Sequence, residues 1–159
     1  MTTPEKSVLG AQPFLRGLQD HHLDTLAALC RHVAVPSGRR LFDEDQHADR
    51  FWLIDAGQVV IDTMVLGRGR LVIETLGRSD VVGVSSLLPP PSLWRFGAVT
   101  TQPMQAFEFN ARAMRAACDC DPSLGYEFSG RVRHRGAQAG GDPHAADRRV
   151  HALGAGPVT

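Results

Sequence analysis

The stretch that decides the fold is LGRSDVVGVSSLLPPPSLWRFGAV, residues 76–99. It predicts a short strand at Val81 and Val82, then Gly83, one tight helical turn and a loop interrupted by prolines. Arg95 then leads into a new strand. The stretch therefore indicates a strand, a turn, a loop and a second strand in quick succession.

Short apolar runs separated by turn residues lie on both sides of this stretch. They occupy residues 51–54, 59–65, 71–76, 96–101 and 104–109. Asp55-Ala56-Gly57 and Gly67-Arg68-Gly69 are turn signals between them. Strands that recur every 8–12 residues or so, with turns between them, are typical of an all-β sandwich or barrel.

Helices are predicted at both ends of the strand region. In residues 20–33 the apolar positions recur at helical spacing, with Asp20 at the N-cap and Pro36-Ser37-Gly38 as the stop. Asn110 caps a helix at residues 111–118, and Asp121 caps another at residues 123–128. The chain then divides into a flexible N-terminus (1–12), one domain (13–129) and a disordered tail (130–159).

Composition limits the class of protein. A chain of 159 residues can bury the core of one domain, and its net charge of zero favours neither nucleic acid nor a membrane surface. Cys30, Cys118 and Cys120 lack paired spacing, and no apolar run approaches the ~18–20 residues that span a bilayer. We therefore expect a cytoplasmic protein with no membrane partner.

The order of helix, about eight short strands and closing helices resembles the cyclic nucleotide-binding domain, a mainly β jelly roll with flanking α-helices at both ends. The resemblance covers roughly residues 13–129. It rests on pieces in the family's order: residues 13–18 (PFLRGL), 36–42 (PSGRRLF), 48–54 (ADRFWLI), 56–59 (AGQV), 76–77 (LG) and 80–83 (DVVG).

The resemblance implies a ligand site. In the family, the turn after the glycine directs backbone N–H groups at a cyclic phosphate, and an arginine neutralises the charge. A small anionic ligand, with cAMP and cGMP as candidates and no other cofactor, is then expected at the residues that match this phosphate-binding cassette. They are Gly83, Val84, Ser85, Ser86, Leu87, Arg95, Phe96, Gly97 and Ala98.

The cassette departs from the family pattern at Val84. The family has an acidic residue there that accepts a hydrogen bond from the ribose 2′-hydroxyl, and valine cannot accept one. A buried donor without its partner costs about 1–3 kcal/mol, or one to two decades of affinity. The resemblance therefore implies a degenerate phosphate-binding cassette.

Three positions keep two interpretations each. Arg95 matches the family's arginine when the strand is aligned locally, but alignment backwards from Pro103 puts Trp94 there and turns Arg95 to the other face. Trp94 either stacks on a purine or packs over the roll. Ser85 and Ser86 either donate to a phosphate or cap the turn.

Other chemistry is not predicted. His21 and His22 are adjacent, so we expect both to be solvated and unable to chelate from one face of a helix. Cys118 and Cys120 lack the second pair of thiols that a structural zinc site requires. The strand region lacks the clustered histidines and carboxylates of a jelly-roll enzyme, and we predict neither an enzyme nor a metal site.

The tail bears on partners. From Gly130 the aliphatic residues give way to Arg, Gly, Ala and His, so we expect no helix-turn-helix and no sequence-specific DNA binding by this chain. The family normally continues here as a long amphipathic helix. A truncated or frameshifted reading frame is therefore one explanation of residues 130–159.

Two functions remain open. In the first, the chain is a regulatory sensor whose ligand moves the helices at residues 111–128. In the second, it is a ligand-free jelly-roll interaction module, a truncated or frameshifted relative of a transcriptional regulator. Its C-terminal helices would then meet a protein partner or a second copy of the chain.

Overall fold

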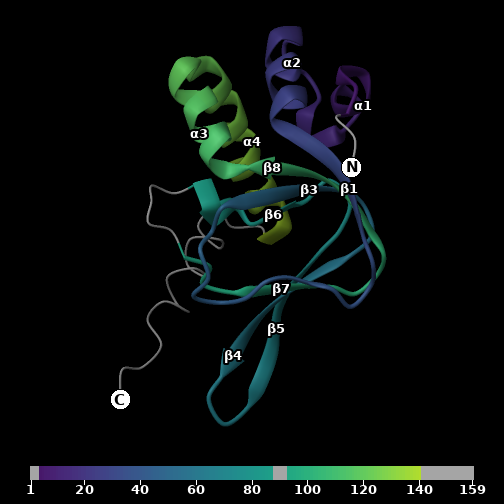
Figure 1. The fold of residues 1–159 in the computed structure, drawn as a ribbon, viewed down its shortest axis with the longest axis vertical. Coiled ribbons are helices and arrows are strands. Elements are labelled where there is room, and N and C mark those ends of the chain that lie inside the picture. Colours follow the sequence, from purple (N-terminus) through teal and green to yellow (C-terminus); the bar gives the residue numbers. More distant parts are fainter. Residues whose placement is uncertain (1–3, 88–92, 141–159) are drawn as a thin grey trace.

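The structure, a computed structural model, describes residues 4–87 and 93–140. Two four-stranded antiparallel sheets face each other, with the strand orders β1-β8-β3-β6 and β2-β7-β4-β5. Helices cover the outer side of the first sheet, and the β4–β5 hairpin projects away from the second (Figure 1). The fold is the predicted one, a mainly β jelly roll with α-helices at both ends.

The elements follow in chain order. The strands are β1 (Cys30–Val35), β2 (Arg40–Phe42), β3 (Arg50–Ala56), β4 (Val59–Val65), β5 (Gly69–Leu76), β6 (Val81–Val82), β7 (Gly97–Thr100) and β8 (Met104–Asn110). The helices are α1 (Lys6–Gly10), α2 (Asp20–Leu29), α3 (Ala111–Cys120) and α4 (Pro122–Gly140), with 3₁₀ turns η1 (Pro13–Leu15) and η2 (Val84–Leu87).

Strand β3 separates two apolar cores. Phe51 and Leu53 pack against the helices, whereas Trp52 and Ile54 pack into the roll between the sheets. Successive side chains of a strand point to opposite faces, so the apolar run from Phe51 to Ile54 serves both cores at once. The cassette lies beside this strand, because β6 pairs with β3.

The closing helices follow the predicted capping. The Asn110 side chain accepts from the Ala113 N–H at 2.9 Å, and Asp121 accepts from the Ser123 N–H at 3.2 Å. Phe128 of α4 then packs edge-on against Phe14, with ring centroids 5.6 Å apart. The two ends of the chain therefore share one core.

The predicted helix at residues 20–33 is wrong in its second part. Helix α2 ends at Leu29, and Cys30 begins β1, where Cys30 pairs with Phe109 and Val33 with Ala106. Hydrogen bonding to β8 outweighs the helical spacing of the apolar residues, because pairing with a central strand satisfies every second backbone group.

The outer boundaries also differ from the prediction. Residues 6–10 form α1 and bury Leu9 completely, where a flexible lead-in was predicted. Helix α4 continues to Gly140, past the predicted boundary at Gly130. Its extension is supported by Arg131, which donates to Glu127 one turn earlier at 2.7 Å and to the carbonyl of Arg16 at 2.9 Å. The remaining tail, residues 141–159, lies outside the described residues, and its disorder stays a prediction.

No helix in the described part of the chain is long and apolar enough to cross a membrane.

Candidate functional site

The cassette begins with a glycine in a backbone conformation that other residues rarely adopt. Gly83 has a φ of +88°, and its carbonyl accepts the Ser86 N–H at 3.0 Å to close η2. A Cβ at this position would lie 2.9 Å from the Trp94 ring and 3.1 Å from the Arg50 carbonyl oxygen. Glycine is therefore required both by the turn and by the close approach of Trp94.

The predicted cassette residues divide between three environments. Val84, Ser85 and Leu87 are half-buried on η2, whereas Ser86 is fully buried. The Ser86 hydroxyl has no hydrogen-bond partner among the described residues. Gly97 and Ala98 are buried on β7, Phe96 is half-buried, and Arg95 is exposed just before that strand. The structure thus places Gly83 to Leu87 together and leaves the Arg95 side chain in solvent.

Trp94 occupies the space between the cassette and the roll. It is 3% exposed and stacks on Phe42 with centroids 3.8 Å apart and planes 12° apart. Trp52 continues the stack, 5.8 Å from Phe42. In this structure Trp94 packs against the roll, the second of its two interpretations. Its ring lies inside the roll and beneath Gly83.

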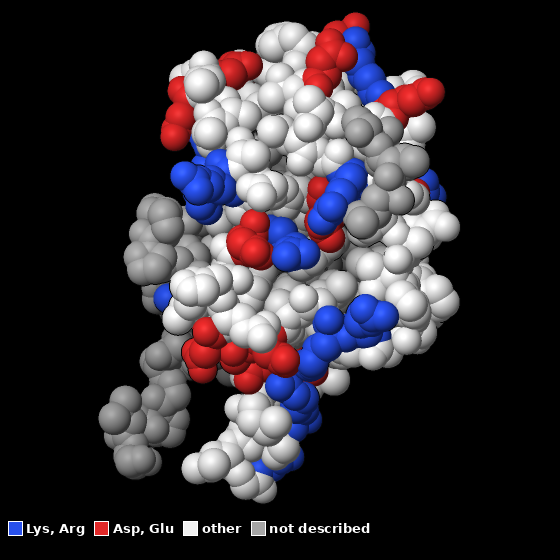
Figure 2. Space-filling view, viewed as in Figure 1, with Lys and Arg blue, Asp and Glu red and all other residues white. Residues whose placement is uncertain are grey.

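A charged cluster that the sequence analysis missed joins β2, β4 and β5. The Asp62 carboxylate, 5% exposed, accepts from Arg40 Nη2 at 2.5 Å and from Arg70 Nη1 at 2.9 Å. Arg70 also reaches Glu44 at 2.9 Å. Figure 2 shows acidic and basic side chains meeting at the base of the projecting hairpin. Alternation along β4 puts Asp62 on the face opposite Val59 and Ile61, but the two arginines that cover it come from β2 and β5, and no local pattern reports them.

Gly97 has its own reason to lack a side chain. A Cβ there would lie 2.5 Å from Asp62 Oδ1 and 2.9 Å from Arg40 Nη1. The absence of a side chain at Gly97 therefore makes room for the ion pair between Asp62 and Arg40. Ala98, the next residue, faces the opposite side and is fully buried in the roll.

The cassette is tied to the closing helices. Arg115 of α3 donates from Nη1 to the carbonyl of Ser86 at 2.5 Å. Leu87, the last residue of η2, packs against the core that the helices share. A charge-assisted hydrogen bond and direct packing therefore join η2 to the closing helices.

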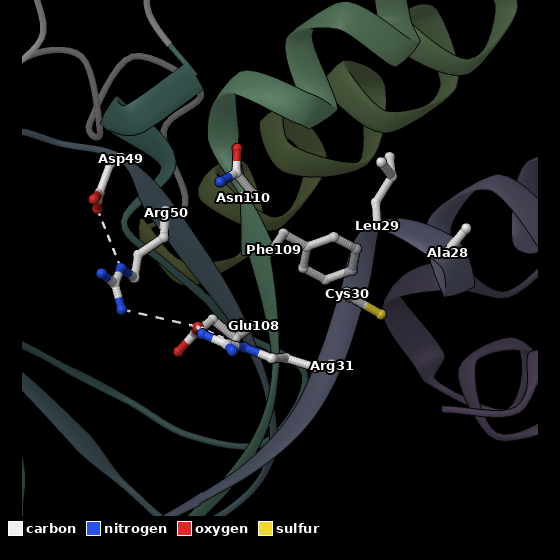
Figure 3. Close-up of a pocket in the computed structure, with 9 residues that line it drawn as sticks. All are labelled: Ala28, Leu29, Cys30, Arg31, Asp49, Arg50, Glu108, Phe109 and Asn110. Atoms are coloured by element: carbon white, nitrogen blue, oxygen red, sulfur yellow. Dashed lines mark hydrogen bonds and ion pairs between the residues drawn. The ribbon is translucent and has the colours of Figure 1, made fainter. Parts of the chain in front are cut away.

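A polar hollow of about 340 Å³ lies beside β1, β3 and β8 (Figure 3). Arg31 donates to Glu108 at 2.6 Å, and Arg50 pairs with Asp49 at 3.1 Å. The hydrogen bond from Arg50 to Asp49 raises the pKa of that guanidinium, and burial raises the pKa of Cys30 to about 12. Each arginine already faces a carboxylate, so this hollow has no excess positive charge with which to hold an anion.

The chain belongs to the cyclic nucleotide-binding domain family, because the model of that family matches residues 32–121. This match confirms the resemblance that the sequence analysis described. Domains of this family are regulatory and sense ligands. None of the curated protein sequences matches this chain significantly.

Solved structures show the same fold. A protein from Geobacter metallireducens that is named for cyclic nucleotide binding has a TM-score of 0.71 at 22% identity, over 81% of this chain and 92% of that one. The catabolite activator protein of Thermus thermophilus has a TM-score of 0.67 at 18% identity, over 90% of this chain and 63% of that one.

A third similar structure is a cAMP-binding acyltransferase from Mycobacterium smegmatis, with a TM-score of 0.67 at 21% identity. The match covers 84% of this chain but 41% of that protein. At such identities the likeness concerns the fold alone. It does not assign an enzymatic activity to this chain.

Proposed function

We propose that this chain is a regulatory sensor that binds a small anionic ligand at η2 and passes the binding event to α3 and α4. The observation that carries the proposal is the bond of 2.5 Å between Arg115 and the carbonyl of Ser86, which joins the cassette to the helices. A ligand that prefers one position of η2 would then also bias the position of α3.

The cassette supplies a limited set of groups for an anion. The backbone N–H groups at the start of η2 and the half-buried hydroxyl of Ser85 are the donors nearest Gly83 in sequence. Arg95 matches the family's arginine in the local alignment, and from its exposed position it would have to fold back over the turn to reach a phosphate. Val84 leaves a ribose hydroxyl without an acceptor. We therefore expect cAMP and cGMP to bind about 10- to 100-fold more weakly than they would to a cassette that keeps the acidic residue.

A second function is favoured by Trp94. Its ring is buried, stacked on Phe42 and in contact range of Gly83, so the space beneath the cassette is filled. A roll that is filled in this way fits a ligand-free interaction module. The closing helices would then present its partner surface, to a protein or to a second copy of the chain.

Calorimetric titration with cAMP and cGMP distinguishes the two. The sensor proposal expects saturable binding by the wild-type chain, at least tenfold weaker in Arg95→Ala and unchanged in Arg68→Ala. Arg68 is the matched control because it is an exposed arginine at the tip of the β4–β5 hairpin.

Val84→Glu restores the acidic residue type and should tighten binding about 10- to 100-fold. If the wild-type chain and Val84→Glu both fail to bind below millimolar concentrations, the sensor proposal for these ligands is wrong.

Transmission is tested separately in the Arg115→Ala chain. Amide hydrogen exchange of residues 111–128 should change on nucleotide addition in the wild type and change much less in Arg115→Ala, while the affinity stays within about threefold. An equal exchange response in both chains would remove Arg115 from the route.

A further inference from the structure

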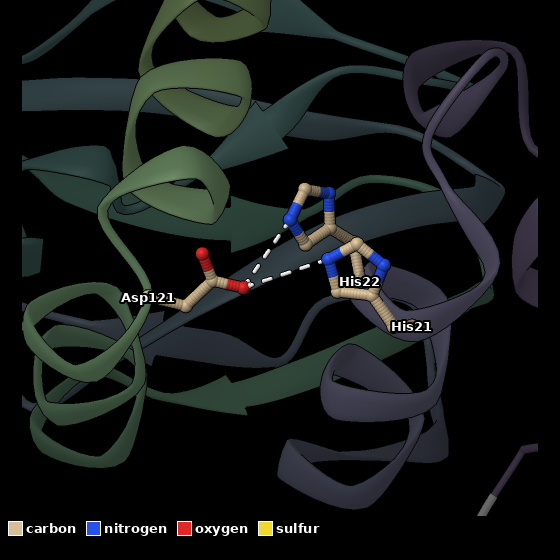
Figure 4. Close-up of side chains that lie close together, drawn as sticks. All are labelled: His21, His22 and Asp121. Atoms are coloured by element: carbon tan, nitrogen blue, oxygen red, sulfur yellow. Dashed lines mark ion pairs between the residues drawn. The ribbon is translucent and has the colours of Figure 1, made fainter.

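His21, His22 and Asp121 come together where the two ends of the domain meet (Figure 4). The histidines lie in the first turn of α2, and Asp121 lies between α3 and α4. The sequence analysis expected both histidines to be solvated, and this is wrong for His22, which is 2% exposed. The α3–α4 junction covers His22, and only the tertiary fold brings that junction to α2.

Although His21 and His22 are adjacent in sequence, both rings approach the same carboxylate. His22 Nε2 lies 3.3 Å from Asp121 Oδ2, and His21 Nε2 lies 3.8 Å from the same oxygen. The two imidazole rings tilt toward each other with centroids 4.1 Å apart. One donor atom from each of the three residues falls within 4.8 Å of the others. Both rings can therefore reach one point beside the carboxylate.

These separations suit a metal ion. Bonds of about 2.0–2.1 Å to nitrogen and oxygen in a tetrahedral site place neighbouring ligand atoms roughly 3.3–3.4 Å apart. We propose that His21, His22 and Asp121 bind one divalent transition-metal ion of the zinc or cobalt type, with water as the fourth ligand. Imidazole nitrogens select such ions over magnesium and calcium, which prefer oxygen ligands.

A neighbouring hydroxyl already orients the carboxylate. Ser123 Oγ donates to Asp121 Oδ1 at 2.5 Å, which leaves Oδ2 directed at the two imidazoles. Contacts of this kind, behind the ligands themselves, fix a metal site's geometry. Ser123 Oγ also lies 2.9 Å from His22 Nε2, so in the metal-free chain Nε2–H donates to this hydroxyl.

Metal binding would move that proton to the other ring nitrogen. His22 Nε2 must offer its lone pair to the ion, so the ring proton moves to Nδ1 and the imidazole stays neutral. Nδ1 is buried and has no hydrogen-bond partner among the described residues. In the metal-bound chain this N–H would therefore be a buried donor that the described residues leave without a partner.

The site would join elements that are distant in the chain. Its ligands come from the first turn of α2 and from the residue that precedes α4. A bound ion would hold α2 to the closing helices and raise the stability of that arrangement. This inference does not depend on a nucleotide at the cassette.

The test is a titration of the untagged full chain with Co²⁺, followed by competition with Zn²⁺. We expect one equivalent of Co²⁺ to bind with the strong visible absorption of a tetrahedral site, and Zn²⁺ to displace it. His21→Ala and Asp121→Asn should each weaken binding by tenfold or more. His32→Ala should leave the affinity unchanged, and it is a matched control because His32 faces another aspartate, Asp55, at 3.6 Å.

Three results would overturn the proposal. They are no binding tighter than millimolar, unchanged binding by His21→Ala, and a thiolate-to-cobalt band in the near ultraviolet, which would assign the ion to Cys118 or Cys120. The His21 side chain is 60% exposed, so this variant is expected to fold. Circular dichroism checks that it does. If Asp121→Asn does not fold, His21→Ala decides alone.

Discussion

Replacing Trp94 by alanine is expected to destabilise the domain by about 4 kcal/mol. The indole is 3% exposed and stacks on Phe42 at a centroid distance of 3.8 Å, so its removal leaves a cavity between β2 and the cassette. Truncation of a large buried aromatic costs about 3–5 kcal/mol, of which roughly 0.5–1.5 kcal/mol reflects the aromatic pair. Trp94→Phe keeps a ring on Phe42 and should lose about 1–2 kcal/mol.

Urea unfolding followed by far-ultraviolet circular dichroism measures this loss. The midpoint should fall while the slope stays the same, because the folded and unfolded states are otherwise unchanged. Tyr126→Ala is the control, since this aromatic side chain is 75% exposed and its removal should change stability by no more than about 0.5 kcal/mol. A Trp94→Ala chain within about 1 kcal/mol of the wild type would refute the packing described here.

Three further outcomes follow from buried or strained positions. Gly83→Ala should lower the free energy of unfolding in urea by about 2 kcal/mol or more, because φ is +88° and the new Cβ would meet the Trp94 ring at 2.9 Å. The loss should be smaller in a Trp94→Ala background, and a purely additive double variant would contradict the contact. Asp62→Asn should lower the free energy of unfolding by about 2 kcal/mol. This is less than the loss expected on breaking a fully buried ion pair, because solvent reaches Arg40. No change in urea unfolding would exclude a stabilising ion pair. Burial raises the pKa of Cys30 from 9.0 to about 12, so the thiol stays protonated in the folded chain while the unfolded chain ionises. The free energy of unfolding of the wild-type chain should therefore fall, relative to that of Cys30→Ala, by up to about 1.4 kcal/mol per pH unit from about pH 9 toward 12. Parallel pH profiles of the two chains would disprove this prediction.

Much of the fold could be predicted from the sequence because its signals are local. The Asn110 cap accepts the Ala113 N–H as expected, and the alternating run at residues 59–65 is β4 with the same bounds. The turn at Gly83 depends on its own backbone conformation, which glycine adopts without a steric cost. In each case the interacting groups lie within a few residues of one another.

The boundary between α2 and β1 was not predictable in this way. Cys30 and Val33 have helical spacing, but their pairing with Phe109 and Ala106 makes them a strand. That pairing involves residues far apart in the chain, and no local pattern reports it.

The sequence by itself determined the order of the strands and turns, the caps and the position of the cassette, because backbone preferences and side-chain periodicity act over short distances. Only the tertiary structure decided that Trp94 lies in the roll and that Asp62 joins Arg40. It also decided that His22 meets Asp121, from an element 99 residues later in the numbering (121 − 22). Each of these contacts joins separate elements, and their geometry depends on how sheets and helices pack rather than on which residues are neighbours in the chain.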